Sequence, residues 1–400
     1  MRHTRASAEI AEHDDERAPR MKCGGAHRGK SMIRLQVGVN WGSGRAGRGV
    51  TLAVAGGGTA GHVVPGLAVL EEWRRLAPEA DFLFLGGEGG FEERFTSMAG
   101  VELVRLPSSP FARQGRRGKA RAAFNAVRAT AAALRLFRTR RPALALGFGG
   151  YASAPALAAA SLAGIPSALH EANLRPGLGN RLSARWVDKV FLGWRETDER
   201  LDNPHCQFVG NPLPRSRLPP GGRTMNGSGL PRVLVLGGSE GSPELNERAP
   251  ALLGAVQRLL SRPLRVLHVC GWGEKAAVES LYRAESVEAR VDCFVEKVED
   301  LYGECDFAVA TAGSFTLAEL AAWRIPALLA PLEGAAGRHQ HANAEAFAAR
   351  SDALLHWEPA LVADLLHAPE KLQRAADRMG RAFDQGAAET LARACLEMIR

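Results

Sequence analysis

AGGGTAGHVVP, at residues 55–65, follows a short apolar run at 50–54 and precedes a segment expected to be helical at 66–75. Two related segments occur in the second half of the chain, VLVLGGSEG at 233–241 and TAGSFTLA at 311–318. Glycines between a strand and a helix let backbone N–H groups approach a phosphate at the positive end of the helix. Three such turns in two halves of the chain predict two α/β domains that face one phosphorylated ligand, and therefore a nucleotide-handling enzyme.

Strand and helix patterns alternate regularly from residue 50 onward. In the first half we expect strands at 50–55, 82–85, 103–106, 144–147, 167–170, 189–192 and 206–209, with helices at 66–75, 119–139, 155–162 and 177–183. In the second half we expect strands at 232–236, 265–269, 291–294, 307–310 and 326–329, with helices at 244–260, 274–284, 316–323 and 370–400. This alternation predicts parallel sheets that are covered by helices on both faces.

Composition divides the chain into five parts. Residues 1–49 are rich in Arg, Gly, His and Ser and predict a disordered, basic extension. We expect one Rossmann-like domain over 50–213 and a second over 232–380. The Pro- and Gly-rich stretch 214–231 is typical of a linker. The last residues, 381–400, are expected to form a helix that packs back on the first domain.

Bulk properties exclude several classes of protein. Hydrophobic residues make up 46% of the chain and charged residues 24%, which is typical of a globular protein. The six cysteines are scattered without a CxxC pair, so we expect reduced thiols and no zinc site. No apolar run reaches the ~18 residues of a spanning helix, and no signal peptide is evident. A cytoplasmic protein is expected.

The net charge of +8 is unevenly distributed. Residues 113–141 contain ten Lys or Arg and no acid. Such a stripe suits an anionic partner, namely nucleic acid, an acidic lipid headgroup or a diphosphate. Nucleic acid is disfavoured because no aromatic interleaving or binding motif accompanies the charge. A solvated helix face remains the alternative.

The glycines of the first turn also match the dinucleotide-binding pattern. Gly56, Gly58 and Gly61 fit GxGxxG, which alone is weak evidence for a dehydrogenase. The second expected strand ends in glycines at 86–87 rather than in an acid that would bind a ribose. The dehydrogenase interpretation is therefore disfavoured.

His62 is the strongest single candidate for a catalytic residue, because it lies in this glycine-rich turn rather than on an apolar face. A neutral imidazole there could take a proton from an attacking hydroxyl, since its ordinary pKa lies near physiological pH. The alternative is a structural histidine that caps the turn.

Polar residues of the second half suit a sugar nucleotide. Glu319 could accept two ribose hydroxyls, or it could stabilise the start of its helix. Gly238, Ser239 and Gly241 could bind a diphosphate, although a tight turn has the same composition. A polar cluster after the strand expected at 326–329 suits sugar hydroxyls or a solvated loop: Arg338, His339, Gln340 and Asn343.

The chain contains no Asp-x-Asp pair of the kind that chelates a metal on a nucleotide diphosphate. If the reaction is sugar transfer, helix N-termini and backbone donors must meet the charge of the leaving group. A site without metal and without cofactor is expected.

Seven motifs in a fixed order resemble the MurG family, which adds N-acetylglucosamine to lipid I in peptidoglycan synthesis. They are GGTAGHVVPGLAV (57–69), GFGGYASAP (147–155), HEAN (170–173), GNP (210–212), GGSEG (237–241), GSFTLAEL (313–320) and RHQHANA (338–344). The resemblance covers residues 50–396, nearly everything except the extension.

The resemblance implies a GT-B fold, in which two Rossmann-like domains flank a cleft. It implies an inverting, metal-free hexosyltransferase that moves N-acetylglucosamine from UDP-N-acetylglucosamine to the C4 hydroxyl of the muramyl sugar of lipid I, giving lipid II. It also implies a peripheral protein on the cytoplasmic face of the cell membrane, with an anionic membrane surface as a partner and no nucleic acid.

The resemblance also assigns residue roles. His62 is the expected base, and the expected donor-binding residues are Thr59, Ala60, Gly61, Asn173, Arg215, Ser239, Ser314, Phe315, Thr316, Glu319 and Gln340. Within that set, Ser239 is assigned to phosphate, Glu319 to ribose, and Asn173 and Gln340 to the sugar. The expected acceptor and membrane side comprises Phe111, Arg113, Arg116, Arg117, Lys119 and Tyr151.

The chain departs from the family pattern at several positions. Ala60 replaces a glycine, Pro214 displaces Arg215 by one position, and His339 replaces a glutamine. Thr311 replaces an arginine and Glu240 a glutamine, which makes the expected diphosphate site less positive. Such a change could cost about 1–3 kcal/mol in donor binding.

These departures keep other functions open. A glycosyltransferase with the same donor and another lipid or small-molecule acceptor is the nearest alternative. UDP-N-acetylglucosamine 2-epimerase shares a related fold, and its mannosamine product forms without an acceptor. A non-catalytic sugar-nucleotide binder is disfavoured, because a binder has no need of a histidine on the attacking side.

Overall fold

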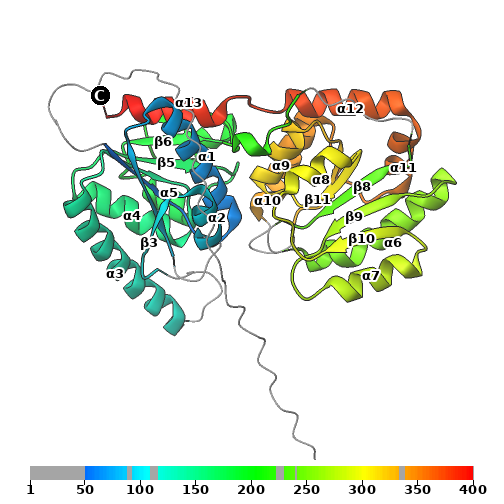
Figure 1. Ribbon diagram of the computed structural model, residues 1–400, viewed down its shortest axis with the longest axis horizontal. Coiled ribbons are helices and arrows are strands. Elements are labelled where there is room, and N and C mark those ends of the chain that lie inside the picture. Colours follow the sequence, from blue (N-terminus) through cyan, green and yellow to red (C-terminus); the bar gives the residue numbers. More distant parts are fainter. Residues whose placement is uncertain are drawn as a thin grey trace, which may run out of the picture. The chain divides into compact units, whose positions relative to one another are not determined.

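The computed structural model describes residues 50–87, 92–108, 116–221, 229–238, 241–332 and 338–399. The extension predicted over 1–49 lies outside this part of the chain. The described residues form two parallel sheets, each with helices on both of its faces (Figure 1). The predicted α/β class is therefore confirmed.

The first sheet has seven strands in the order β3-β2-β1-β4-β5-β6-β7. The strands are β1 (Thr51–Ala55), β2 (Asp81–Gly86), β3 (Glu102–Arg105), β4 (Leu144–Gly147), β5 (Ser167–Glu171), β6 (Lys189–Leu192) and β7 (Cys206–Phe208). The helices of this half are α1 (Ala60–Leu76), α2 (Glu92–Ala99), α3 (Arg116–Arg140), α4 (Gly150–Leu162) and α5 (Leu178–Ser183).

The second sheet has five strands in the order β10-β9-β8-β11-β12. The strands are β8 (Arg232–Leu236), β9 (Arg265–Val269), β10 (Glu288–Asp292), β11 (Phe307–Ala310) and β12 (Ala327–Leu329). The helices are α6 (Pro243–Leu260), α7 (Lys275–Ala284), α8 (Val298–Glu304), α9 (Ser314–Ala322), α10 (Arg338–Ser351), α11 (Pro359–His367), α12 (Pro369–Arg381) and α13 (Ala387–Glu397).

Strand β1 shows why its sequence is continuously apolar. Leu52 and Val54 pack in the cluster that includes α1 and α13, whereas Ala53 and Ala55 pack in the cluster that includes α3 and α4. Successive side chains of a strand point to opposite faces, so a strand covered on both faces needs apolar residues throughout. Strand β8 repeats the arrangement. Val233 and Val235 share a core with α6, and the intervening Leu234 shares one with α9.

Parallel strands end at one edge of their sheet, and ligands of such sheets bind outside the carboxyl ends of the strands. The glycine turn after β1 lies at this edge of the first sheet. The turns after β8 and β11 lie at the corresponding edge of the second sheet, because these two strands pair directly. The fold thus gathers the three turns singled out in the sequence at the ligand-binding edges.

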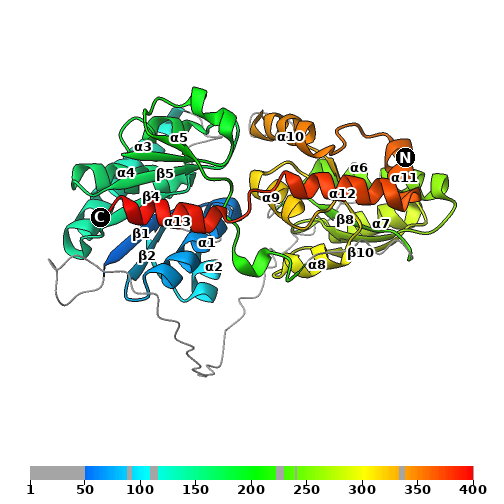
Figure 2. The same ribbon diagram turned by 90° about the horizontal axis from the view of Figure 1, so that it is seen from above.

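The single helix expected over 370–400 is wrong: the structure has α12 and α13 with a break between them. Gly386 has φ +77° just before α13, a backbone conformation that favours glycine and ends a continuous helix. Helix α13 returns to pack along α1 (Figure 2), where the indole nitrogen of the fully buried Trp73 donates to the carbonyl of Ala392 at 2.9 Å. None of the helices in the described ranges is both long and apolar enough to span a bilayer.

Candidate active site

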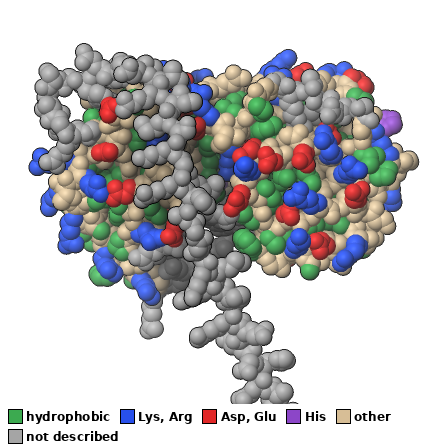
Figure 3. Space-filling model, in the orientation of Figure 1, with side chains coloured by type: hydrophobic (Ala, Val, Ile, Leu, Met, Phe, Trp, Pro, Cys, Tyr) green, Lys and Arg blue, Asp and Glu red, His purple; other side chains and the backbone are tan. Residues whose placement is uncertain are grey.

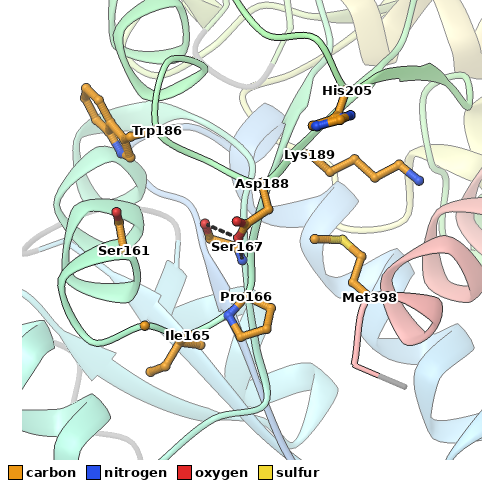
Figure 4. Close-up of a pocket in the computed structure, with 10 residues that line it drawn as sticks. Ser161, Ile165, Pro166, Ser167, Trp186, Asp188, Lys189, His205 and Met398 are labelled. Atoms are coloured by element: carbon orange, nitrogen blue, oxygen red, sulfur yellow. Dashed lines mark hydrogen bonds between the residues drawn. The ribbon is translucent and has the colours of Figure 1, made fainter.

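Two cavities are candidates for the functional site. One, of about 600 Å³, lies at the amino ends of β5 and β6 and is drawn in Figure 4. Its carboxylate, Asp188, already accepts hydrogen bonds from the backbone N–H of Ser167 at 2.7 Å and from the hydroxyl of that residue at 3.2 Å. None of the predicted site residues lines this cavity, which is at the wrong end of the strands for a ligand of a parallel sheet.

The second cavity, of about 340 Å³, lies at the carboxyl ends of the strands and is lined by residues from both sheets. We call it the active-site cavity. It brings together ten of the predicted residues: Thr59, Ala60, Gly61, His62, Asn173, Ser314, Phe315, Thr316, Glu319 and Gln340. Segments separated by more than 250 residues of sequence thus contribute to one site.

Other predicted residues do not line this cavity or cannot be placed. Arg215 donates to Glu72 of α1, with 2.6 Å between Nε and Oε1, and does not line the cavity, so the structure does not bring it together with the other predicted donor-binding residues. Ser239, Phe111 and Arg113 lie outside the described residues, and the side chains of Arg116, Arg117 and Lys119 are not described.

His62 lies in the first turn of α1, where its backbone N–H donates to the carbonyl of Thr59 at 3.0 Å. Its Nδ1 lies 3.2 Å from the hydroxyl oxygen of Thr59. Burial lowers the pKa of His62, and this effect outweighs the hydrogen bond to Gly57 and the nearby Glu92 carboxylate, which act in the opposite direction. The imidazole is therefore neutral at physiological pH and able to accept a proton.

Glu92, which the sequence did not single out, holds the turn before His62. Its Oε1 accepts from the backbone N–H groups of Gly58 at 2.9 Å and Gly87 at 3.2 Å. Gly58 has φ +95°, and a Cβ there would lie 2.7 Å from Cε1 of Tyr151. Tyr151, predicted on the acceptor side, therefore packs against this turn rather than lining the cavity.

The HEAN segment at the end of β5 is fixed by a second buried carboxylate. Glu171 Oε1 accepts from the backbone N–H of Asn173 at 2.8 Å, and its Oε2 accepts from Nδ2 of Asn180 at 2.8 Å. Burial raises the pKa of Glu171, partly offset by these donors. His170 contacts the carbonyl of Gly210 at 2.9 Å, and burial lowers its pKa to about 4. A neutral His170 thus donates to the GNP segment and fixes it beside HEAN.

Asn173 joins the two halves of the chain. Its Oδ1 accepts from the hydroxyl of Ser314 at 2.9 Å and from Nδ2 of Asn343 at 3.1 Å. Asn343 is fully buried, and its Oδ1 accepts from the backbone N–H of Leu174 at 3.0 Å. Asn343, which the sequence pattern grouped in a polar cluster, therefore links the two halves of the chain at the site.

The carboxylate of Glu319 has two protein partners. Oε1 forms an ion pair with Arg217, and Oε2 accepts from the hydroxyl of Tyr302 at 2.7 Å. Gln340 accepts through Oε1 from the backbone N–H of Leu332 at 3.1 Å. Arg217 and Tyr302 both line the cavity, and the sequence predicted neither.

Together these features define the GT-B fold class, with two parallel α/β sheets and a cavity lined by residues that follow strands of both sheets. Residues 52–192 match the model of the glycosyltransferase family 28 N-terminal domain, and residues 232–392 match that of its C-terminal domain. The chain belongs to the MurG family.

Individual comparisons agree with this assignment. A protein of Alcanivorax borkumensis named UDP-N-acetylglucosamine–N-acetylmuramyl-(pentapeptide) pyrophosphoryl-undecaprenol N-acetylglucosamine transferase is 39% identical over 309 residues, which are 76% of this chain and 84% of the relative. The crystal structure of Acinetobacter baumannii MurG is 25% identical with a TM-score of 0.67, covering 87% of this chain and 99% of that one. A putative UDP-N-acetylglucosamine 2-epimerase from Listeria monocytogenes is 12% identical with a TM-score of 0.65, covering 86% and 95%, and shares the fold alone.

Proposed function

We propose that the protein transfers N-acetylglucosamine from UDP-N-acetylglucosamine to the C4 hydroxyl of the muramyl sugar of lipid I, giving lipid II and UDP. The observation that carries the proposal is that neutral His62, the start of α9 and the polar side chains Glu319 and Gln340 line one cavity. The family supplies the reaction, and this arrangement supplies groups for each of its steps.

In the proposed reaction the C4 oxygen attacks C1 of the donor sugar while His62 takes the hydroxyl proton. The bond between C1 and the oxygen of the β-phosphate breaks, UDP leaves with the bonding electrons, and the configuration at C1 inverts. The N-terminus of α9 and the glycine turns favour the charge that develops on UDP. Phe294 lines the cavity with its ring stacked on Trp272, 6.2 Å between centroids, and offers an aromatic face for the uracil base.

The test is transfer of labelled sugar from UDP-N-acetylglucosamine to a lipid I analogue in the presence of EDTA, with a control lacking acceptor. We expect acceptor-dependent transfer that survives EDTA. Donor binding without transfer would support the UDP-sugar donor and indicate that the acceptor is a molecule other than lipid I. A mannosamine product formed without acceptor would replace the proposal with the epimerase.

We propose that helix α3 holds the enzyme on an anionic membrane surface as a peripheral protein. Arg121 and Arg128 are exposed on this helix, and so are Phe124 (63% exposed) and Val127 (69%). In Figure 3, basic side chains lie along the edge of the molecule at which Figure 1 draws α3. Cationic heads that attract acidic lipid and apolar groups that enter the interface are the two signals needed for stable peripheral binding.

Replacing Phe124 and Val127 together with serine should lower binding to vesicles containing phosphatidylglycerol by about tenfold or more, because each apolar side chain contributes about 1.5–3 kcal/mol when fully buried. Co-sedimentation measures it. Leu259→Ser, at an equally exposed position (58%) on α6, is the matched control and should bind as the unaltered protein does. An equal loss of vesicle binding in the two variants would contradict the assignment of membrane binding to α3.

A further inference from the structure

The charges around the active-site cavity do not match those of a nucleoside diphosphate. Among the lining residues that the structure describes, Glu171, Glu296 and Glu319 are acidic and Arg217 is the only Lys or Arg. Thr311, which stands where the family pattern has an arginine, lines the same cavity without a charge. A diphosphate that enters this cavity therefore meets one described cation.

Arg217 reaches the cavity from the short 3₁₀ turn Arg215–Arg217. Its backbone is fixed because the indole nitrogen of Trp323 donates to its carbonyl at 2.8 Å. Its side chain, 18% exposed, forms an ion pair with Glu319. Arg215, two residues earlier, instead pairs with Glu72 outside the cavity. The two arginines of this turn therefore lie in different environments, Arg217 in the cavity and Arg215 outside it.

The ion pair occupies the carboxylate proposed to bind the ribose. Tyr302 takes Oε2 of Glu319 and Arg217 takes Oε1, so ribose hydroxyls must share or displace these partners. A buried arginine that loses its carboxylate needs another anion, because an unpaired buried charge is costly. The ribose and the α-phosphate of a nucleotide are adjacent, so the ligand that takes Glu319 also brings a replacement anion.

We propose that Arg217 binds the diphosphate of the donor by exchange, leaving Glu319 when the ribose hydroxyls take its place. This inference rests on the proposed donor and not on the acceptor. The planar guanidinium can donate two parallel hydrogen bonds to phosphate oxygens. Arg217, which comes from a different segment, thereby supplies the positive charge that the site lacks because Thr311 stands where the family pattern has an arginine.

The test is calorimetric titration of Arg217→Met with UDP and with uridine, using Arg232→Met as the matched control, because Arg232 also pairs with a buried carboxylate, that of Asp306, and does not line the cavity. Removing a charge-assisted contact should weaken UDP binding by about 10- to 100-fold. Uridine lacks phosphate, so its affinity should stay the same or rise, because Glu319 has lost its competitor. Arg232→Met should bind both ligands as the unaltered protein does.

The two ligands distinguish a binding role from a structural one. Equal loss of UDP and uridine affinity would show that Arg217 only holds Glu319 in place, and it would overturn the inference. Unchanged UDP affinity would also overturn it while leaving the proposed function standing. If the unaltered protein failed to bind UDP, the proposed donor and this inference would both fall.

Removal of one partner of a buried ion pair can prevent folding, so circular dichroism should accompany each titration. Arg217→Gln provides a second variant, since its amide can still donate to Glu319 without a charge. The same selective loss of UDP affinity is expected of it, and binding of both ligands at unaltered strength would contradict the proposal. Raising the salt concentration should weaken UDP binding to the unaltered protein more than to this variant.

Discussion

Replacing His62 with alanine should lower kcat by about 10²- to 10⁴-fold, the usual contribution of a general base, while UDP binds with unchanged affinity. The reason is that His62 is neutral and lies at the start of α1 in the active-site cavity, where it can take the proton of the attacking hydroxyl. Initial rates of sugar transfer and calorimetry with UDP measure the two effects separately.

His205 provides the control, because it lines the cavity at the opposite end of the strands. His205→Ala should retain full turnover. Turnover of His62→Ala within a few-fold of the unaltered enzyme would leave His62 as a structural residue that interacts with the Thr59 hydroxyl.

The pH dependence follows from the same group. Burial lowers the pKa of His62 below its ordinary value of 6.5, so the neutral imidazole is the predominant form from pH 8 down to pH 6.5. The rate should therefore stay above half of its maximum over that range and fall at lower pH, as the imidazole gains a proton and loses its ability to accept another. An inflection above pH 6.5 would contradict this assignment.

The second large effect concerns the ribose. Glu319→Gln should weaken binding of both uridine and UDP by about 10- to 100-fold, because a neutral amide replaces a carboxylate that accepts charge-assisted hydrogen bonds. The glutamine side chain keeps a carbonyl acceptor for Tyr302 but leaves Arg217 without its carboxylate, so circular dichroism should accompany these titrations as well. Calorimetry with both ligands measures the loss.

Glu299→Gln makes the same charge change in the neighbouring helix α8, at a residue that does not line the cavity. It should leave both affinities within about twofold, a change too small to count as a lost hydrogen bond. If both variants weakened binding alike, the effect would arise from the charge of the region and not from a contact to ribose.

Much of the fold could be predicted, because strands that are covered by helices on both faces have continuously apolar sequences and are followed by glycine turns. Strands such as β1 and β8 carry both signals. The helix expected over 370–400 was wrong, since its amphipathic pattern does not show that Gly386 adopts a left-handed conformation.

The presence of His62 and Glu319 in the cavity could be predicted because each lies just after a glycine-containing turn between a strand and a helix, whereas their roles there remain predictions. Glu92 was missed because its partners include the backbone N–H of Gly58, which only the folded chain brings near. Glu171 was missed because the HEAN motif does not show that this carboxylate turns back to the N–H of Asn173 and the side-chain amide of Asn180. Arg217 was missed because the sequence around Pro214 does not show which arginine of a 3₁₀ turn faces the cavity. Orientation in such a turn is set by tertiary contacts, here Glu72 for one arginine and Glu319 for the other.

The return of α13 to α1 has a consequence for dissecting the chain. Leu391 and Cys395 of α13 are fully buried in the core of the first sheet, so this core is completed by residues that follow the whole second sheet in the sequence. A fragment that stops after β7 would expose the apolar face of α1 and leave the indole of Trp73 without its acceptor. A chain emerging from the ribosome must therefore be synthesised through α13 before this core can close, and we expect a synthetic α13 peptide added in trans to restore the core of a protein truncated before α13.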